Sequence, residues 1–228
     1  MRENGARILM ATLYIFSKLK NKKARERALE EFKDQYEYPD FDDVGQISDY
    51  LSEWLQNCLG ISHDADKLYW KTYPTEVQIN CHSYLDFDHL ENTIAKPELN
   101  PEGNYDGETG TQIIARQKKV LAAYRTLIMV GKLASPPITI DFNCTIDDNK
   151  VEDAEASYYG ECSIEDMEAI DHATERLEEY INDYMSFCAR ELERLLEEDI
   201  DWHHSEEHLK EVLEDNQYTE FNYKGEIA

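Results

Sequence analysis

The sequence predicts an α+β fold: an antiparallel sheet of about four strands, packed by helices, with a long acidic helix near the C-terminus. Residues 138–146 alternate apolar and polar side chains without interruption, which is typical of a half-buried strand. Residues 112–132 are rich in Ala, Leu and Lys and predict a helix. From Ser163 to about Asp199, apolar residues recur every three or four positions, which predicts one long amphipathic helix.

The N-terminal part predicts two helices separated by a loop. The first helix is expected over residues 18–34, and either Ser17 or Asn21 can supply its N-cap. The second helix is expected over residues 42–58, after a short stretch that contains Pro39.

The next part of the chain predicts a hairpin and a short helix. Two strands are expected over residues 67–72 and 76–85, joined by Tyr73-Pro74-Thr75. A short helix is expected over residues 88–95. Residues 96–111 contain two Pro and three Gly and therefore predict a loop or an insertion before the helix that begins at residue 112.

The C-terminal third begins with a second predicted hairpin, in which Asp147-Asp148-Asn149 turns the strand 138–146 back into residues 150–159. Ser163-Ile-Glu-Asp166 matches the start signal of a helix. The buried stripe expected for that helix comprises Ile164, Met167, Ile170, Ala173, Leu177, Ile181, Tyr184, Cys188, Leu192 and Leu195.

A last helix over residues 206–215, capped by Ser205, and an extended segment over residues 218–223 complete the predicted elements. The sequence has no internal repeat and no clear linker, so we expect a single domain over residues 1–228, with residues 1–12 disordered.

Composition predicts a soluble protein of the cytoplasm. Hydrophobic residues make up 41% of the chain, which is enough for a core. The five Cys are odd in number and form no C-x-x-C pair, so we expect reduced core cysteines. No secretory signal is recognisable, and the longest apolar run, residues 126–130, is too short to span a bilayer.

Net charge is distributed unequally along the chain. Of the net charge of −26, residues 147–228 contribute 27 acidic and 6 basic side chains, whereas residues 1–146 contribute 22 acidic and 17 basic ones. A surface of this sign repels nucleic acid and lipid headgroups and attracts basic proteins. The charge therefore predicts a basic protein partner, with no direct binding of nucleic acid or membrane; a homodimer is also left open.

The acidic helix is the candidate binding surface for such a partner. Its proposed contact residues are Glu165, Glu168, Asp171, Glu175, Glu178, Glu179, Glu197, Glu198 and Asp199. Residues 161–201 hold 15 acids and 3 bases, or one net charge per ~5 Å of helix, against ~1.7 Å of axis for duplex DNA. Resemblance to a duplex therefore requires nearby acids, such as those of residues 147–155 and 206–215, or a second subunit. The alternative is an ordinary solvated helix face.

A histidine cluster is the candidate metal site. His204-x-x-Glu207-His208 has the spacing of the inverzincin metalloprotease motif, in which two histidines hold zinc and the acid serves as base. Three facts weigh against this interpretation: Ser205 as a helix cap leaves His204 outside the helix, no motif supplies a third ligand, and an acidic region matches the motif easily by chance. A polar surface turn is the alternative.

The other chemical motifs are weak or missing. No phosphate-binding glycine loop and no G-x-S-x-G is present. Carboxylate pairs such as Asp86/Asp88 and Asp147/Asp148 lack the rest of a calcium loop and are more typical of turns. The sequence therefore indicates no reaction and no cofactor.

The chain resembles a family of small, uncharacterised proteins from tailed bacteriophages. The resemblance is spread over most of the chain, and each cue is soft. The cues lie at residues 13–16, 23–31, 36–43, 59–61, 68–70, 189–194 and 205–216, and include Tyr36-Glu-Tyr-Pro-Asp-Phe-Asp-Asp43 and Ser205-Glu-Glu-His-Leu-Lys-Glu-Val-Leu-Glu-Asp-Asn216. It implies a phage origin, and it supplies no catalytic residues.

In charge and size, the chain also resembles the acidic, DNA-mimicking anti-restriction proteins of phages. This resemblance implies a non-enzymatic inhibitor of a host defence or DNA-processing protein, acting in the host bacterial cytoplasm. Two alternatives stay open: a metal-dependent hydrolase that uses His204, Glu207 and His208, and a phage interaction module whose acidity serves only solubility.

Overall fold

The computed structural model describes part of the chain: residues 14–36, 48–49, 51–52, 68–72, 74–82, 87–88, 90–91, 107–215, 219–222 and 224–227. Residues 1–12 and most of the helices expected over 42–58 and 88–95 lie outside the described residues.

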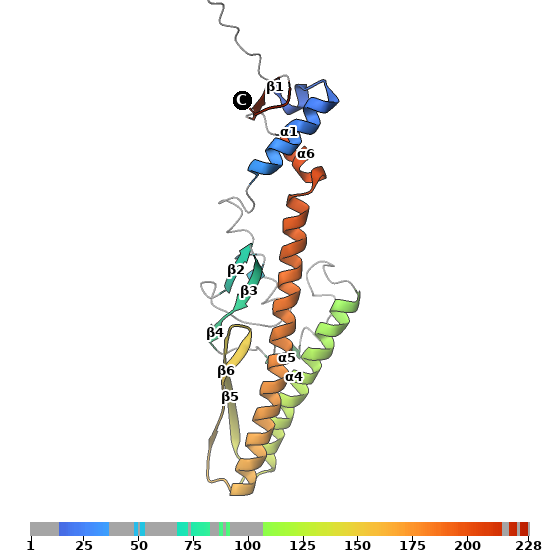
Figure 1. Ribbon diagram of the computed structural model, residues 1–228. Helices are drawn as coiled ribbons and strands as arrows, with labels where there is room; N and C mark the ends of the chain where they lie inside the picture. The colour runs from blue at the N-terminus through green and yellow to red at the C-terminus, as the bar shows by residue number, and fades with distance from the viewer. Residues whose placement is uncertain are drawn as a thin grey trace, which may run out of the picture. The chain divides into compact units, whose positions relative to one another are not determined.

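Helices and antiparallel strand pairs form a mixed α+β structure (Figure 1). In chain order the elements are β1 (Tyr14–Ile15), η1 (Phe16–Lys18), α1 (Lys22–Gln35), β2 (Leu68–Thr72), β3 (Thr75–Ile79), β4 (Cys81–His82), α4 (Gly107–Leu133), β5 (Thr139–Asp147), β6 (Lys150–Tyr159), α5 (Ile164–His203), α6 (Glu206–Asp215) and β7 (Glu220–Phe221).

The chain packs as two compact units, where one domain was expected. The terminal unit consists of Met1–Asp40 and Glu198–Ala228, and the central unit consists of Phe41–Glu197.

In the terminal unit, α1, α6 and the two-stranded β1–β7 sheet enclose a small apolar core. The buried members of this core are Phe16, Leu19, Ala28, Leu29, Leu209, Leu213 and Phe221. Asn21, one of the two expected caps, caps α1 because its Oδ1 accepts a hydrogen bond from the backbone N of Lys23 at 3.0 Å.

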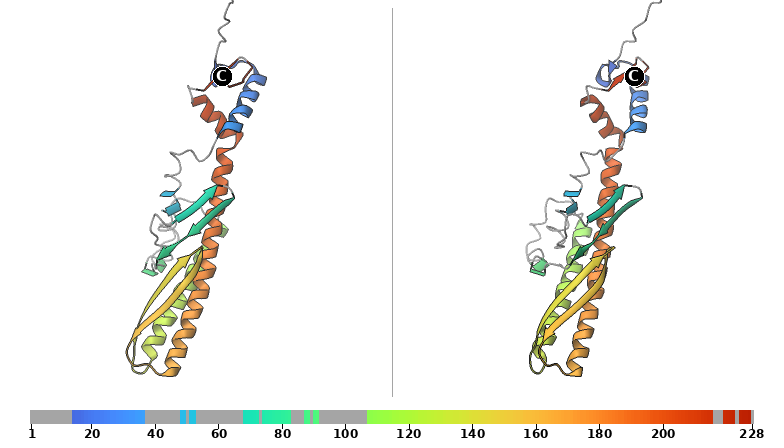
Figure 2. Two further views of the ribbon diagram at one scale, coloured as in Figure 1. Left: turned by 60° about the vertical axis from the view of Figure 1, so that its left-hand side comes forward. Right: turned by 90° about the vertical axis from the view of Figure 1, so that its left-hand side faces the viewer.

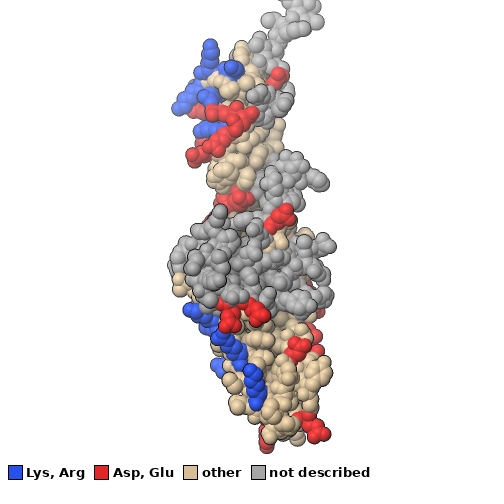
Figure 3. Space-filling model, turned by 180° about the vertical axis from the view of Figure 1, so that it is seen from behind, with Lys and Arg blue, Asp and Glu red and all other residues tan. Residues whose placement is uncertain are grey.

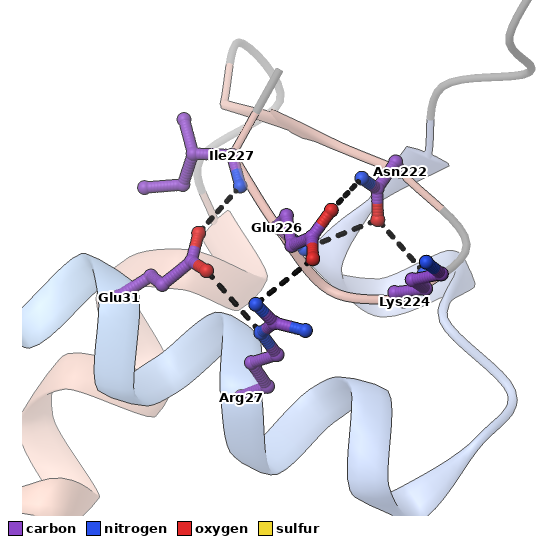
Figure 4. A network of polar contacts seen from close by, with 6 residues as sticks. All are labelled: Arg27, Glu31, Asn222, Lys224, Glu226 and Ile227. Carbon is purple, nitrogen blue, oxygen red and sulfur yellow. Dashed lines mark hydrogen bonds and ion pairs between the residues drawn. The ribbon is translucent and has the colours of Figure 1, made fainter.

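The C-terminal segment is held against α1 by a polar network (Figure 4). Nη2 of Arg27 lies 2.8 Å from Oε1 of Glu226, and the backbone N of Ile227 donates to Oε2 of Glu31 at 2.8 Å. Oδ1 of Asn222 accepts hydrogen bonds from the backbone N of Lys224 and of Glu226. Bases of α1 thus neutralise the acidic C-terminal segment of their own chain.

In the central unit, the long β5–β6 hairpin lies along the helices α4 and α5 (Figure 2). The strand alternation expected from the sequence is confirmed, because Ile140, Phe142, Cys144 and Ile146 are buried. The α4 and α5 helices are joined by a buried hydrogen bond, in which Nε2 of Gln117 donates to Oη of Tyr184 at 3.1 Å.

The single sheet of about four strands is not formed; the described residues form three sheets, of two, two and three strands. The expected strand 76–85 is divided at Asn80 into β3 and β4. Asn149, whose φ is 63°, bonds to the backbone of β3 through its side chain. Its Oδ1 accepts a hydrogen bond from the backbone N of Ile79 at 2.8 Å, and its Nδ2 donates one to the carbonyl of Val77 at 3.0 Å. Turn side chains therefore take the place of a neighbouring strand.

Further expectations about helix bounds and buried positions differ from the structure. The α4 helix begins at Gly107, inside the expected loop 96–111, because a helix tolerates Gly at a cost of only ~1 kcal/mol. The α5 helix continues past Asp199 to His203. Ile164 is 71% exposed at the first position of α5, and Leu196 is buried at 2% exposure where Leu195 was expected.

Candidate functional site

The long helix α5 begins where the sequence signal places it. Oγ of Ser163 accepts a hydrogen bond from the backbone N of Asp166 at 3.1 Å and donates to the carboxylate of the same residue. The apolar stripe of α5 is buried against the rest of the central unit, so the acidic side chains of the helix face outward.

The nine predicted contact residues all lie on α5. Eight of them are exposed, and Glu178 is half-buried. Seven, from Glu165 to Glu197, belong to the central unit, whereas Glu198 and Asp199 belong to the terminal unit.

A hydrogen bond between β6 and α5 fixes the direction of one row of these acids. The backbone N of Val151, in β6, donates to Oδ1 of Asn182, in α5, at 2.7 Å. Asp171, Glu175 and Glu178 precede Asn182 by 11, 7 and 4 residues, so they lie on the same stripe of the helix. This row of acids therefore runs beside β6.

Strand β6 adds acids to the same row. The register of the hairpin pairs Asn143 with Glu155 and Thr145 with Asp153, on the side of the strands opposite the buried residues Phe142 and Cys144. Both carboxylates are exposed. We call the surface formed by these five side chains the acidic edge: Asp153, Glu155, Asp171, Glu175 and Glu178.

The acidic edge carries a higher charge density than the helix alone. At ~3.3 Å per strand residue and ~1.5 Å per helix residue, Asp153 lies level with Glu178, and Glu155 lies at a height between Glu175 and Asp171. Asp171, the last acid of the row, lies 7 residues or ~10 Å from Glu178 along α5. Residues 153–155 and 171–178 hold five acids and one base, so this distance carries one net charge per ~2.6 Å, against ~5 Å for the helix alone and ~1.7 Å for duplex DNA.

Sequence reasoning missed Asp153 and Glu155 as site residues, although it required acids from residues 147–155 near the helix. The alternation of residues 138–146 and the turn at Asp148 and Asn149 predict Glu152, and not Asp153, opposite Thr145 on the outward side. A register shift between Thr145 and Ile146 places Asp153 and Glu155 there instead, and the local pattern does not signal this shift. The hydrogen bond to Asn182, which places β6 beside the acidic row, has no signal in the local sequence.

The opposite stripe of α5 faces α4. A groove of about 240 Å³ between the two helices is lined by Lys119, Ala122, Ala123, Thr126, Ala173, Arg176 and Tyr180. A hydrogen bond with Tyr180 raises the pKa of Arg176, so the Arg176 side chain stays positively charged.

The predicted metal cluster takes a different arrangement in the terminal unit. His208 meets His203 rather than His204, with Nδ1 of His203 at 3.1 Å from Nε2 of His208. Nδ1 of His204 lies 2.9 Å from the carbonyl of Ile200, and Glu207 is exposed. The reason is the cap expected from the sequence: Oγ of Ser205 accepts from the backbone N of His208, which leaves His204 in the turn between α5 and α6.

No group of three or more His, Cys, Asp or Glu side chains is placed to hold a metal ion within the described residues. Cys144, Cys162 and Cys188 are free thiols: Cys144 and Cys188 are buried, and Cys162 is half-buried. Burial raises the pKa of the Cys188 thiol well above its ordinary value, which suits a core residue rather than a nucleophile.

None of the helices in the described part of the chain is both long enough and apolar enough to cross a membrane. Comparison with known proteins finds no match to this chain among protein-family models, curated proteins or solved structures. The function is therefore argued from the geometry and charge of the acidic edge.

Proposed function

We propose that the chain is a non-enzymatic inhibitor whose acidic edge occupies a basic, nucleic-acid-binding surface of another protein. The observation that carries this proposal is the gathering of five carboxylates in the acidic edge, to which β6 and α5 both contribute, at about twice the charge density of the helix alone. The other exposed acids of α5, from Glu165 to Asp199, extend the contact along the helix. The resemblance to tailed-phage proteins makes a host defence or DNA-processing protein, in the bacterial cytoplasm, the expected target.

The chemistry of the edge favours a protein partner over nucleic acid itself. Phosphates and the acidic edge carry the same sign, so they repel each other, whereas Lys and Arg side chains of a DNA-binding cleft can pair with both. Such pairing is fast to form and weakens as salt rises. No observation in the described residues favours the metal-dependent hydrolase as a second proposal.

Capture from a bacterial lysate, followed by competition with DNA, tests this function. The immobilised chain should retain proteins that elute as salt rises and that a duplex oligonucleotide displaces at constant salt. An Asp153→Lys/Glu155→Lys bait should retain far less of the same proteins. A Glu30→Lys/Asp34→Lys bait is the matched control, because it carries the same charge change at exposed positions of α1. Retention that is indifferent to duplex DNA, or equal on all three baits, would show that the proposed function is wrong.

A further inference from the structure

A row of exposed bases on α4 has no use in the proposed function. Lys118, Arg125 and Lys132 are exposed and lie seven residues apart, so they form one line along the helix. Figure 3 shows this side of the molecule, and a row of basic side chains is visible in the lower part of the view. The α4 helix carries five bases and one acid, Glu108, in a chain of net charge −26.

This row cannot neutralise the acids of its own α5. Arg116 and Ala123 face α5, because Nε of Arg116 lies 3.3 Å from Oδ2 of Asp183 and Ala123 lines the groove between the helices. Lys118 and Arg125 each follow one of these residues by two positions, or ~200° around the helix. The row therefore points away from α5 of the same chain. Arg125 pairs with Glu91 of its own chain, since its Nη2 lies 2.5 Å from Oε1 of Glu91. Lys118 and Lys132 are therefore the cations of the row that we assign to a second molecule.

Beside the cations lies a column of apolar residues, one of which, Ala122, also lines the groove. Ala115, Ala122 and Met129 are exposed and also lie seven residues apart. A helix can approach closely over such a column, and a flanking row of cations then favours acids on the approaching helix, as charged side chains do beside a coiled-coil seam. Helix α5 of this chain is an acidic helix with seven-residue spacing, because Glu168 and Glu175 are exposed on its outward side.

Within one chain, the contacts fix the relative heights of α4 and α5. Arg116 touches Asp183, Lys119 lines the groove with Tyr180, and Thr126 lines it with Ala173, so the helices run antiparallel. This register places Lys118 level with Ile181, Arg125 level with Thr174 and Lys132 level with Met167.

We propose that a second copy of this chain docks on this face, with α4 of each copy against α5 of the other. A two-fold axis parallel to the helices keeps every height unchanged. It sets Lys118 near Glu179 and Lys132 near Glu168 of the second copy. A two-fold axis across the helices would instead set α4 against α4 and oppose like charges, so charge complementarity selects the first arrangement. The interface is closed, so it produces a dimer and not a fibre.

The dimer leaves the partner surface accessible. Asp153 and Glu155 of β6, together with Asp171 and Glu178 on the β6 side of α5, lie outside the proposed seam. Glu168 and Glu179 belong both to the seam and to the predicted partner-contact residues of α5. Asp153 and Glu155 belong only to the acidic edge, so a variant at these two positions separates failure of the proposed function from failure of the dimer.

Sedimentation equilibrium of the full chain, with reciprocal charge reversal, tests the dimer. The wild type should be dimeric. We expect two double variants, Lys118→Glu/Lys132→Glu and Glu168→Lys/Glu179→Lys, each to raise the dissociation constant at least ~100-fold. Each variant sets like charges against each other, and the two-fold symmetry repeats every such contact. An equimolar mixture of the two variants should restore a heterodimer, because both seams then pair opposite charges. All four side chains are exposed, so both variants should fold, as circular dichroism can verify.

The control is Asp153→Lys/Glu155→Lys, which changes the net charge as the α5 variant does but lies outside the seam; it should remain dimeric. A wild type that is monomeric at about 100 μM, variants that dimerise as well as the wild type, or a mixture that stays monomeric would overturn the proposal.

Discussion

The backbone N of Val151 donates a hydrogen bond to Oδ1 of Asn182 at 2.7 Å, and this bond ties the start of β6 to α5. It is a half-buried contact between residues 31 positions apart. Without it, the acids of β6 and those of α5 would belong to two unrelated surfaces. The bond places Asp153 and Glu155 beside the row formed by Asp171 and Glu178, and so creates the acidic edge.

Replacement of Asn182 by Leu removes the acceptor for the Val151 amide. We expect the free energy of unfolding to fall by about 1–3 kcal/mol, because a partly buried amide is left without its partner. Hydrogen exchange at the Val151 amide should accelerate more than exchange along the rest of β6. The control is Asn143→Ala, an exposed Asn on the outer side of the same hairpin. Unchanged exchange at Val151 in the Asn182 variant would show that the two elements are held together by other contacts.

Much of this hairpin could be predicted from sequence, because its signals are local. The alternation of residues 138–146 fixes the buried side, and Asp148 and Asn149 adopt the positive φ angles that such residues tolerate in a turn. The caps at Ser163 and Ser205 are local in the same sense, since each bonds an amide three residues ahead.

Pairings between distant segments could not be predicted in this way. Strands β1 and β7 are two residues each, too short to show a period, and they pair across almost the whole chain. The acidic edge depends on a bond from β6 to α5, and the exposure of the α4 cations depends on which side of α4 meets α5. Sequence spacing places such residues on one stripe of a helix, but only the packed neighbours decide what that stripe faces.

The bond between Gln117 and Tyr184 predicts a second stability effect. Both side chains are fully buried between α4 and α5. Tyr184→Phe removes the hydroxyl that accepts from Nε2 of Gln117, so unfolding should require about 1–3 kcal/mol less. Adding Gln117→Leu to this variant should recover part of the loss, since an apolar pair leaves no donor unsatisfied. Tyr159→Phe, at an 82% exposed position, should have little effect on chemical denaturation. A Tyr184→Phe variant as stable as wild type would contradict the prediction.

Gly225 predicts a local effect in the terminal unit. Its φ is +85°, and an added Cβ would lie 1.9 Å from the carbonyl oxygen of Ala24 in α1. Gly225→Ala should therefore release the C-terminal segment and its contacts with Arg27 and Glu31, with a cost of at least ~2 kcal/mol for the docked state. Limited proteolysis should cleave the C-terminus faster than in the wild type or in the exposed control Lys224→Ala. Equal cleavage of all three proteins would contradict this account.

The same network predicts a pH dependence. The hydrogen bond from Asn222, aided by the charge of Arg27, lowers the pKa of Glu226. Because the pKa is lower in the folded state, the stabilising contribution is complete above the ordinary glutamate pKa of ~4.3 and is lost as pH falls through the lower, folded value. The side-chain amide resonances of Asn222 should report a titration midpoint below ~4.3. Asn222→Ala should raise the pKa of Glu226, which can be followed on its own carboxyl carbon; a midpoint at or above the ordinary value in wild type would contradict the prediction.

The central claim is that the acidic edge, rather than net charge alone, binds basic nucleic-acid-binding surfaces. The most direct measurement is the concentration of each protein that displaces a labelled DNA duplex from a captured target at fixed salt. Asp153→Lys/Glu155→Lys should require at least ~10-fold more protein than wild type, whereas Glu30→Lys/Asp34→Lys, with the same charge change on α1, should stay within ~2-fold of wild type. Equal displacement by the two variants would contradict the account.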